Sequence, residues 1–233
     1  MNGQISGSNR ISLHQVRDLA LENSVAKLYD DKLPYHNFGH VQDTLEAADK
    51  IIERCHQERI RVVTKVVYYA LLFHDAGYHH DHAQLGYESK EAYSAALAEQ
   101  HTCDSGLTNK ERLKISAAVM ATHRNGVFVS VEQKLVRAAD LAGLAAPYEI
   151  FLNNTVQLWI EHQMLNGPAS WRAWQKSVSE TLGFYLSQQI RLTSYYCNND
   201  GASTFHLAVE SNLKRFLEEP APSEPSRHPS GLQ

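Results

Sequence analysis

The feature that most constrains the fold of this chain is a strongly apolar segment that ends in two adjacent polar residues. Residues 66–73 read Val-Val-Tyr-Tyr-Ala-Leu-Leu-Phe, and His74 and Asp75 follow directly. Burying an imidazole and a carboxylate beside such a segment is costly unless each group is paired or binds a metal ion. The segment therefore predicts a buried helix, and the pair predicts either a hydrogen-bond network or a metal site at its end.

Two more polar residues give the His-Asp pair a context. His40 closes the stretch Tyr35-His36-Asn37-Phe38-Gly39-His40, and Asp140 lies within Arg137-Ala138-Ala139-Asp140-Leu141. His40 falls just inside one predicted helix, the pair at the end of the next, and Asp140 near the end of a later one. We expect these three helices to converge and to bring His40, His74, Asp75 and Asp140 together.

Helical signals account for most of the chain. Three capping boxes mark helix starts, at Ser12/Gln15, Thr108/Glu111 and Ser130/Gln133. Hydrophobic periodicity predicts helices near 12–30, 38–57, 61–76, 87–101, 108–122, 130–143, 147–165, 169–195 and 203–218. Gly77 is the expected left-handed stop after the third. The sequence predicts an all-α fold, a single bundle of about eight to nine helices, because no strand pattern competes.

Length and composition are those of a globular protein with one substantial core. The chain has 233 residues, of which 43% are hydrophobic and 21% charged. We expect a flexible N-terminus over residues 1–11, one helical domain over 12–218, and a disordered tail rich in proline and serine over 219–233.

Charge and cysteine content exclude several classes of partner and site. The formal net charge of −4 argues against a long nucleic acid or an anionic membrane as the main partner. The segment 66–73 is too short to span a bilayer, and the first ten residues lack a secretory signal. Cys55, Cys103 and Cys197 form no Cys-x-x-Cys pair, which disfavours a disulfide framework or a thiolate zinc site. A cytoplasmic location is expected.

The order H…HD…D after an apolar run resembles the HD superfamily of metal-dependent phosphohydrolases, an all-helical group. A subgroup of predicted HD phosphohydrolases of undefined substrate is similar over about residues 12–195. The residues that carry this resemblance are Tyr35-His36-Asn37-x-x-His40, His74-Asp75-x-x-Tyr78, Glu88-x-x-x-x-Tyr93-Ser94-Ala95 and Ala139-Asp140-Leu141. The chain departs from the subgroup at Tyr87-Glu88, where Asn-Glu is usual, and at Trp159-Ile160-Glu161-His162, a helix that in relatives carries an arginine.

The resemblance implies a metal-dependent phosphohydrolase that acts on a small phosphoester or a nucleotide. The implied metal ligands are His40, His74, Asp75 and Asp140. Imidazole and carboxylate ligands suit Mn, Fe, Co, Ni or Zn, with Mg favoured by carboxylates. Such a set leaves coordination positions open for water and substrate, and the metal would activate that water. The identity and number of the metal ions and the oligomeric state stay open.

Six residues are candidates for catalysis or for substrate binding. Asp75 resembles the bridging ligand and proton handler of the family, and Glu88 and His123 are the candidates for acid or base work. The guanidinium of Arg124 can donate two parallel hydrogen bonds to a phosphate group. The alternative is that Arg124 lies in solvent at the end of a helix, where the dipole favours a cation. His36 and Asn37 are candidate substrate-binding residues or supports of the metal ligands, although Asn37 is equally a helix N-cap.

Alternative functions remain open from the sequence. Some HD relatives are di-iron oxygenases, but they need extra histidines, and here His123 is well placed and His101 less so. A non-catalytic module in which a metal staples helices or senses a ligand is a third option. The histidine-rich loop 79–82 is expected to be exposed, with adventitious metal binding or a role as a lid as its two interpretations.

Overall fold

A computed structural model of the chain describes residues 12–222, and this part is helical without a β-sheet. The helices are α1 (Leu19–Val25), α2 (Phe38–Gln57), α3 (Thr64–Phe73), α4 (Lys90–Thr102), α5 (Asn109–Met120), α6 (Val131–Asp140), α7 (Tyr148–Asn166), α8 (Trp171–Leu186) and α9 (Thr204–Leu217). Short 3-10 turns are η1 (Leu13–Gln15), η2 (Ala26–Leu28), η3 (Leu141–Ala145) and η4 (Ser194–Tyr196). The predicted all-α fold class is confirmed.

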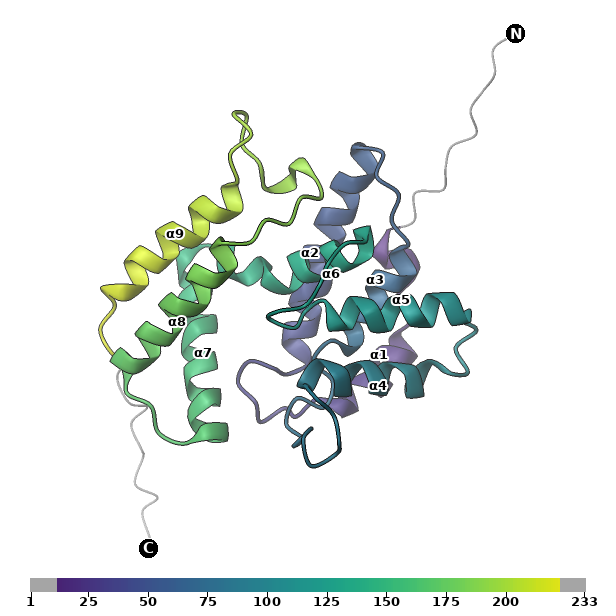
Figure 1. The fold of residues 1–233 in the computed structure, drawn as a ribbon, viewed down its shortest axis with the longest axis horizontal. Helices are drawn as coiled ribbons and strands as arrows, with labels where there is room; N and C mark the ends of the chain where they lie inside the picture. The colour runs from purple at the N-terminus through teal and green to yellow at the C-terminus, as the bar shows by residue number, and fades with distance from the viewer. Residues whose placement is uncertain (1–11, 223–233) are drawn as a thin grey trace, which may run out of the picture.

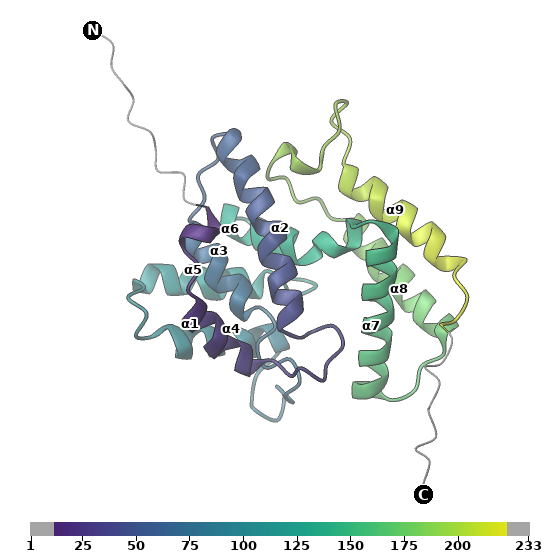
Figure 2. The same ribbon diagram turned by 180° about the vertical axis from the view of Figure 1, so that it is seen from behind.

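The helices form two groups that lie side by side (Figure 1). Helices α1 to α6 make up one group and α7 to α9 the other, and the view from behind shows the same division (Figure 2). Each group has its own hydrophobic cluster: the first is built mainly from α2, α3, α5 and α6, and the second from α7, α8 and α9. The single predicted core is thus divided, and η3 leads from α6 to α7 between the two groups.

Helix α3 lies at the centre of the larger group. Every residue of α3 except Lys65 is buried, and the helix packs against α1, α2, α4, α5 and α6. A helix that is apolar on all sides is stable only inside a core. The apolar segment 66–73 therefore fixes the middle of the fold and carries the His-Asp pair into it.

The chain turns sharply after α3. The helix ends at Phe73, three residues before its predicted end, and His74 is its C-cap. Gly77 adopts the left-handed conformation, with φ of 72°, as predicted. A β-carbon there would lie 2.5 Å from a ring carbon of Tyr93, so glycine is required on both counts.

Two predicted helices are wrong in extent. The segment 12–30 is broken because the backbone of Asp18 is extended, and its carboxylate instead caps α1 by accepting from the amides of Ala20 and Leu21. The segment 169–195 stops being helical at Leu186, because the following residues run back to the first hydrophobic cluster, where Ile190 and Leu192 pack. Every other predicted helix agrees to within three residues at each end.

Other predictions concern helix starts, spans and termini. The three capping boxes are present, although the box at Ser12 starts only the turn η1. Within residues 12–222, no helix combines the length and apolar character that crossing a bilayer requires. The predicted flexible N-terminus, 1–11, and most of the predicted tail, 223–233, lie outside the described residues.

Candidate metal centre

Three helix ends bring the four predicted ligands together. His40 lies in the first turn of α2, His74 and Asp75 directly follow α3, and Asp140 is the last residue of α6. These helices pack against one another in all three pairs. One ligand atom from each residue lies within 4.8 Å of the ligand atoms of the other three. Within residues 12–222, no second group of His, Cys, Asp or Glu side chains is arranged in this way.

The spacing of these atoms suits a single metal ion. Nε2 of His40 lies 3.7 Å from Asp75 Oδ2 and 3.4 Å from Asp140 Oδ1. Nε2 of His74 lies 3.2 Å and 3.5 Å from the same two oxygens. Atoms held about 2.1 Å from one ion lie about 3.0 Å apart in octahedral and about 3.4 Å apart in tetrahedral geometry. The observed separations, 3.2–3.7 Å, lie within a few tenths of an ångström of these values.

The ring of His74 is oriented for ligation. Its Nδ1 donates to the backbone oxygen of Leu71 at 2.8 Å, which leaves the lone pair on Nε2. That Nε2 is buried and makes no hydrogen bond, although two carboxylate oxygens lie close to it. A nitrogen lone pair facing two anionic oxygens is repelled unless a proton or a metal cation lies between them. The four residues therefore fit a divalent metal, because an imidazole fixed through its other nitrogen is the usual form of a histidine ligand.

The electrostatics of the cluster also favour a cation. Burial raises the pKa of Asp140, but the imidazoles of His40 and His74 beside it outweigh that effect and bring the pKa down to about 2. Asp75 follows the same pattern, with burial opposed mainly by the charge of His74, and its pKa lies well below the ordinary value. Burial lowers the pKa of His74, yet the two carboxylates raise it well above the ordinary value. Both carboxylates stay ionised, and the site attracts positive charge.

Behind His40, a buried carboxylate from the second helix group orders the loop that precedes α2. Glu161 of α7 is 2% exposed and accepts from the amides of Tyr35 and His36 at 3.0 and 2.9 Å. Its other oxygen pairs with Nδ1 of His36, and the ring of Tyr35 packs against the ring of His40 with centroids 4.6 Å apart. Sequence reasoning missed the role of Glu161, because α7 carries a second acidic residue, Glu149, and several other polar residues that no local pattern distinguishes from it.

Asn37 is the N-cap of α2. Its side-chain oxygen accepts from the amide of Gly39 at 2.8 Å, and its amide group donates to the backbone oxygens of Leu33 and Pro34. The capping alternative describes what this side chain does in the structure. Its contribution to the site is to start the helix two residues before His40.

The remaining predicted site residues lie outside the cluster of four. Glu88 is exposed in the segment before α4. His123 is half-buried after α5, and its backbone oxygen accepts from Arg137 at 2.8 Å. Arg124 is exposed, and its guanidinium lies 4.5 Å from the centroid of the Phe184 ring. Their roles stay predictions.

Arg137 organises the segment that carries His123 and Arg124, and sequence reasoning did not single it out for this. It is fully buried in α6, one turn before Asp140, and donates to the backbone oxygens of Ala121, His123 and Arg124. A further bond reaches the side chain of Gln188 at 2.8 Å. A buried arginine bound to carbonyls in this way fixes a loop rather than a substrate.

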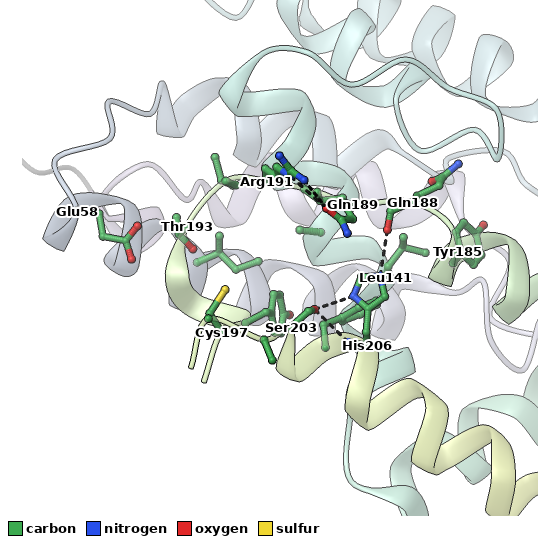
Figure 3. Close-up of a pocket in the computed structure, with 18 residues that line it drawn as sticks. Glu58, Leu141, Tyr185, Gln188, Gln189, Arg191, Thr193, Cys197, Ser203 and His206 are labelled. Atoms are coloured by element: carbon green, nitrogen blue, oxygen red, sulfur yellow. Dashed lines mark hydrogen bonds between the residues drawn. The ribbon is translucent and has the colours of Figure 1, made fainter. Parts of the chain in front are cut away.

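A cavity of about 790 Å³ lies between the end of α2, η3, the segment after α8 and the start of α9 (Figure 3). Leu141 and Tyr185 line it, but none of the four candidate ligands does. Its polar side chains are already engaged, since Glu58 accepts from Ser194, Arg191 donates to Gln189 and His206 pairs with Ser203. This cavity is a feature separate from the metal centre.

Comparison with known proteins shows similarity at the level of structure. No protein-family model matches the chain, and no curated protein matches it either. Among solved structures, the chain is similar to the phosphodiesterase domain of the rhodopsin phosphodiesterase of Salpingoeca rosetta, with a TM-score of 0.59. The two are 17% identical, and the match covers 84% of this chain and 78% of that one. This similarity shows that the two proteins share an arrangement of helices.

Proposed function

We propose that the protein is a metal-dependent phosphohydrolase of the HD type that acts on a small phosphoester, with a nucleotide as the leading candidate. The observation that carries the proposal is the cluster formed by His40, His74, Asp75 and Asp140, whose ligand atoms all lie within 4.8 Å of one another. The helical arrangement shared with a phosphodiesterase domain supports it. The cytoplasmic location expected from the sequence belongs to the same proposal.

The residues of the chain would hold the cation and orient its surroundings. Bound there, a divalent cation such as Mn, Fe, Co, Ni, Zn or Mg polarises a phosphoryl oxygen and acidifies water. Asp75 and Asp140 supply two negative charges that balance the ion. His74 keeps its proton on Nδ1 and presents Nε2, and His36 holds a proton at Nδ1 against Glu161.

General acid and base work is assigned within the proposal to Asp75, Glu88 and His123, and phosphate binding to Arg124 and His36. Asp75 lies in the cluster, whereas Glu88 and His123 lie outside it. The variants Glu88→Gln and His123→Asn separate these roles. Each should lower kcat about 100-fold or more without loss of metal if the residue transfers a proton. Unchanged pH–rate profiles would remove it from the mechanism.

The test combines metal analysis with an activity screen. Purified protein is compared with the His74→Ala/Asp75→Ala variant by elemental analysis. Both are then screened for phosphate release from nucleotides and small phosphoesters with added Mn, Mg, Ni, Co or Fe. We expect stoichiometric metal and metal-dependent release in the wild type alone. Metal without release under any condition would contradict the hydrolase and favour an oxygenase, which needs dioxygen, or a binding module.

A further inference from the structure

A lysine beside the metal centre has no role in the description above. Lys90, the first residue of α4, places its Nζ 3.3 Å from the centroid of the Tyr78 ring. The ring of His36 stacks on the same tyrosine, with centroids 3.7 Å apart and planes 12° apart. At these distances the His36 ring and the Lys90 ammonium group cannot both lie on the same face of the Tyr78 ring. Tyr78 is therefore held between His36 and Lys90.

This stack is joined to the metal centre through two of its members. Tyr78 lies three residues after Asp75, and its amide donates to the backbone oxygen of Asp75 at 3.1 Å. The ring of His36 lies 6.0 Å from the ring of His40, centroid to centroid. Burial lowers the pKa of Lys90, while the charges of Asp75 and Glu161 act to raise it. The ammonium group thus lies within the electrostatic field of the ligand cluster.

The fold gives Lys90 no anionic partner. Across residues 12–222, no carboxylate lies within ion-pair distance of it and it makes no hydrogen bond, so the nearby acidic groups act on it only through their charge. The side chain is half-buried, and a cation in the first turn of a helix is also disfavoured by the helix dipole. A contact with one aromatic ring replaces only part of the lost hydration. Stability of the fold does not account for a lysine at this position.

We propose that Lys90 is a substrate-binding residue that holds an anionic phosphate oxygen next to the metal centre. The inference rests on the proposed function and narrows its substrate class. Two aspartates balance a divalent cation, and Glu161 is engaged by His36 and two backbone amides, so the ammonium of Lys90 is a positive charge that a dianionic phosphate group satisfies best. The preferred substrate is therefore a phosphomonoester, and a monoanionic diester gains less from Lys90. Tyr78 positions the lysine, because the Lys90 side chain packs on the face of the Tyr78 ring opposite His36.

The test uses two variants and a matched control. Lys90→Met keeps the length and apolar stem of the side chain, and Lys90→Arg keeps the charge. Lys176→Met changes an exposed lysine on α8. Metal content is measured by elemental analysis, and binding of inorganic phosphate to the metal-loaded protein by calorimetry. We expect Lys90→Met to keep its metal and to bind phosphate at least tenfold more weakly, while Lys90→Arg and Lys176→Met stay within threefold of the wild type.

Kinetics extend the test to the substrate class. Lys90→Met should raise KM more than it lowers kcat, and the loss of kcat/KM should be larger for a monoester than for a diester of the same alcohol. Wild-type phosphate affinity in Lys90→Met, or loss of the metal from it, overturns the proposal. Phosphate binding that depends on Lys90 in a protein that hydrolyses no ester would refute the proposed function and leave this site standing.

Discussion

Asp140 is the residue at which α6 enters the metal centre, with one oxygen 3.4 Å from Nε2 of His40 and 3.5 Å from Nε2 of His74. The variant Asp140→Asn removes the charge and keeps the shape. We expect metal affinity to fall by more than about 100-fold, the upper end of the effect of losing an outer partner of a ligand. Metal titration measures this. Asp43→Asn, an exposed position on α2, should bind metal like the wild type; equal affinities in both variants would remove Asp140 from the ligand set.

The sequence indicated the four candidate ligands but not the residues around them. His40, His74, Asp75 and Asp140 could be found because each ends or begins a helix beside an apolar run, in an order that is itself a pattern. Lys90 and Glu161 had no such signal. Each acquires its neighbours only when helices distant in sequence pack together: Glu161 meets His36 across 125 residues. Local patterns carry no information about such contacts.

Among the contacts between helices and loops, the hydrogen bonds of Glu161 join α7 to the loop before α2. The variant Glu161→Ala leaves the amides of Tyr35 and His36 and the ring of His36 without an acceptor in a buried place. We expect a loss of about 2–5 kcal/mol in the free energy of unfolding, measured in urea. Metal affinity should fall about tenfold, because the loop ahead of His40 loosens.

Glu161→Gln is the matched control for this contact. It keeps one oxygen for the two backbone amides, so most of the stability should remain. Its amide group meets Nδ1 of His36 as a donor, which forces the proton of that ring to Nε2. Stability and metal affinity of Glu161→Ala equal to those of the wild type would show that α7 is not needed to order the loop.

Helix positions were predictable where the pattern was local. The capping boxes at Thr108 and Ser130 fix the starts of α5 and α6, since their side chains bond amides only three residues away. The end of α8 was not predictable in the same way. Residues 187–193 leave the helix to place Ile190 and Leu192 on the first cluster, a gain that depends on the whole fold.

At the scale of the whole molecule, Arg137 joins α6 to the segment after α5 and to the segment after α8. The variant Arg137→Met keeps an apolar stem and leaves several backbone oxygens and Gln188 without a donor. We expect a loss of about 2–4 kcal/mol in the free energy of unfolding. Lys134→Met on the same helix, where the half-buried lysine makes one hydrogen bond to the backbone oxygen of Arg191, should lose less than about 1 kcal/mol. Equal losses in the two variants would show that the hydrogen bonds of Arg137 do not stabilise the fold.

The charges of the metal centre should give the metal-free and metal-loaded protein opposite responses to pH. In the metal-free fold the pKa of His74 is raised, so its contribution to stability is complete below the unfolded pKa of about 6.5 and is lost as pH rises through the folded value. The pKa of Asp140 is lowered to about 2, and that of Asp75 is lowered as well. Their contribution is present above about pH 4 and is lost only in acid.

Metal binding reverses the effect of His74, because a ligand imidazole must be neutral and binding releases its proton. As pH rises above about 6.5, Tm of the metal-free protein should fall while the stabilisation by added metal grows. Thermal unfolding with and without a saturating divalent metal measures both trends. The His74→Asn variant should lose the decline of the metal-free protein, since the titrating group is gone. If Tm of the wild type changes with pH in the same way with and without metal, His74 is not a metal ligand. Its buried Nε2 then carries a proton and donates it to the carboxylates.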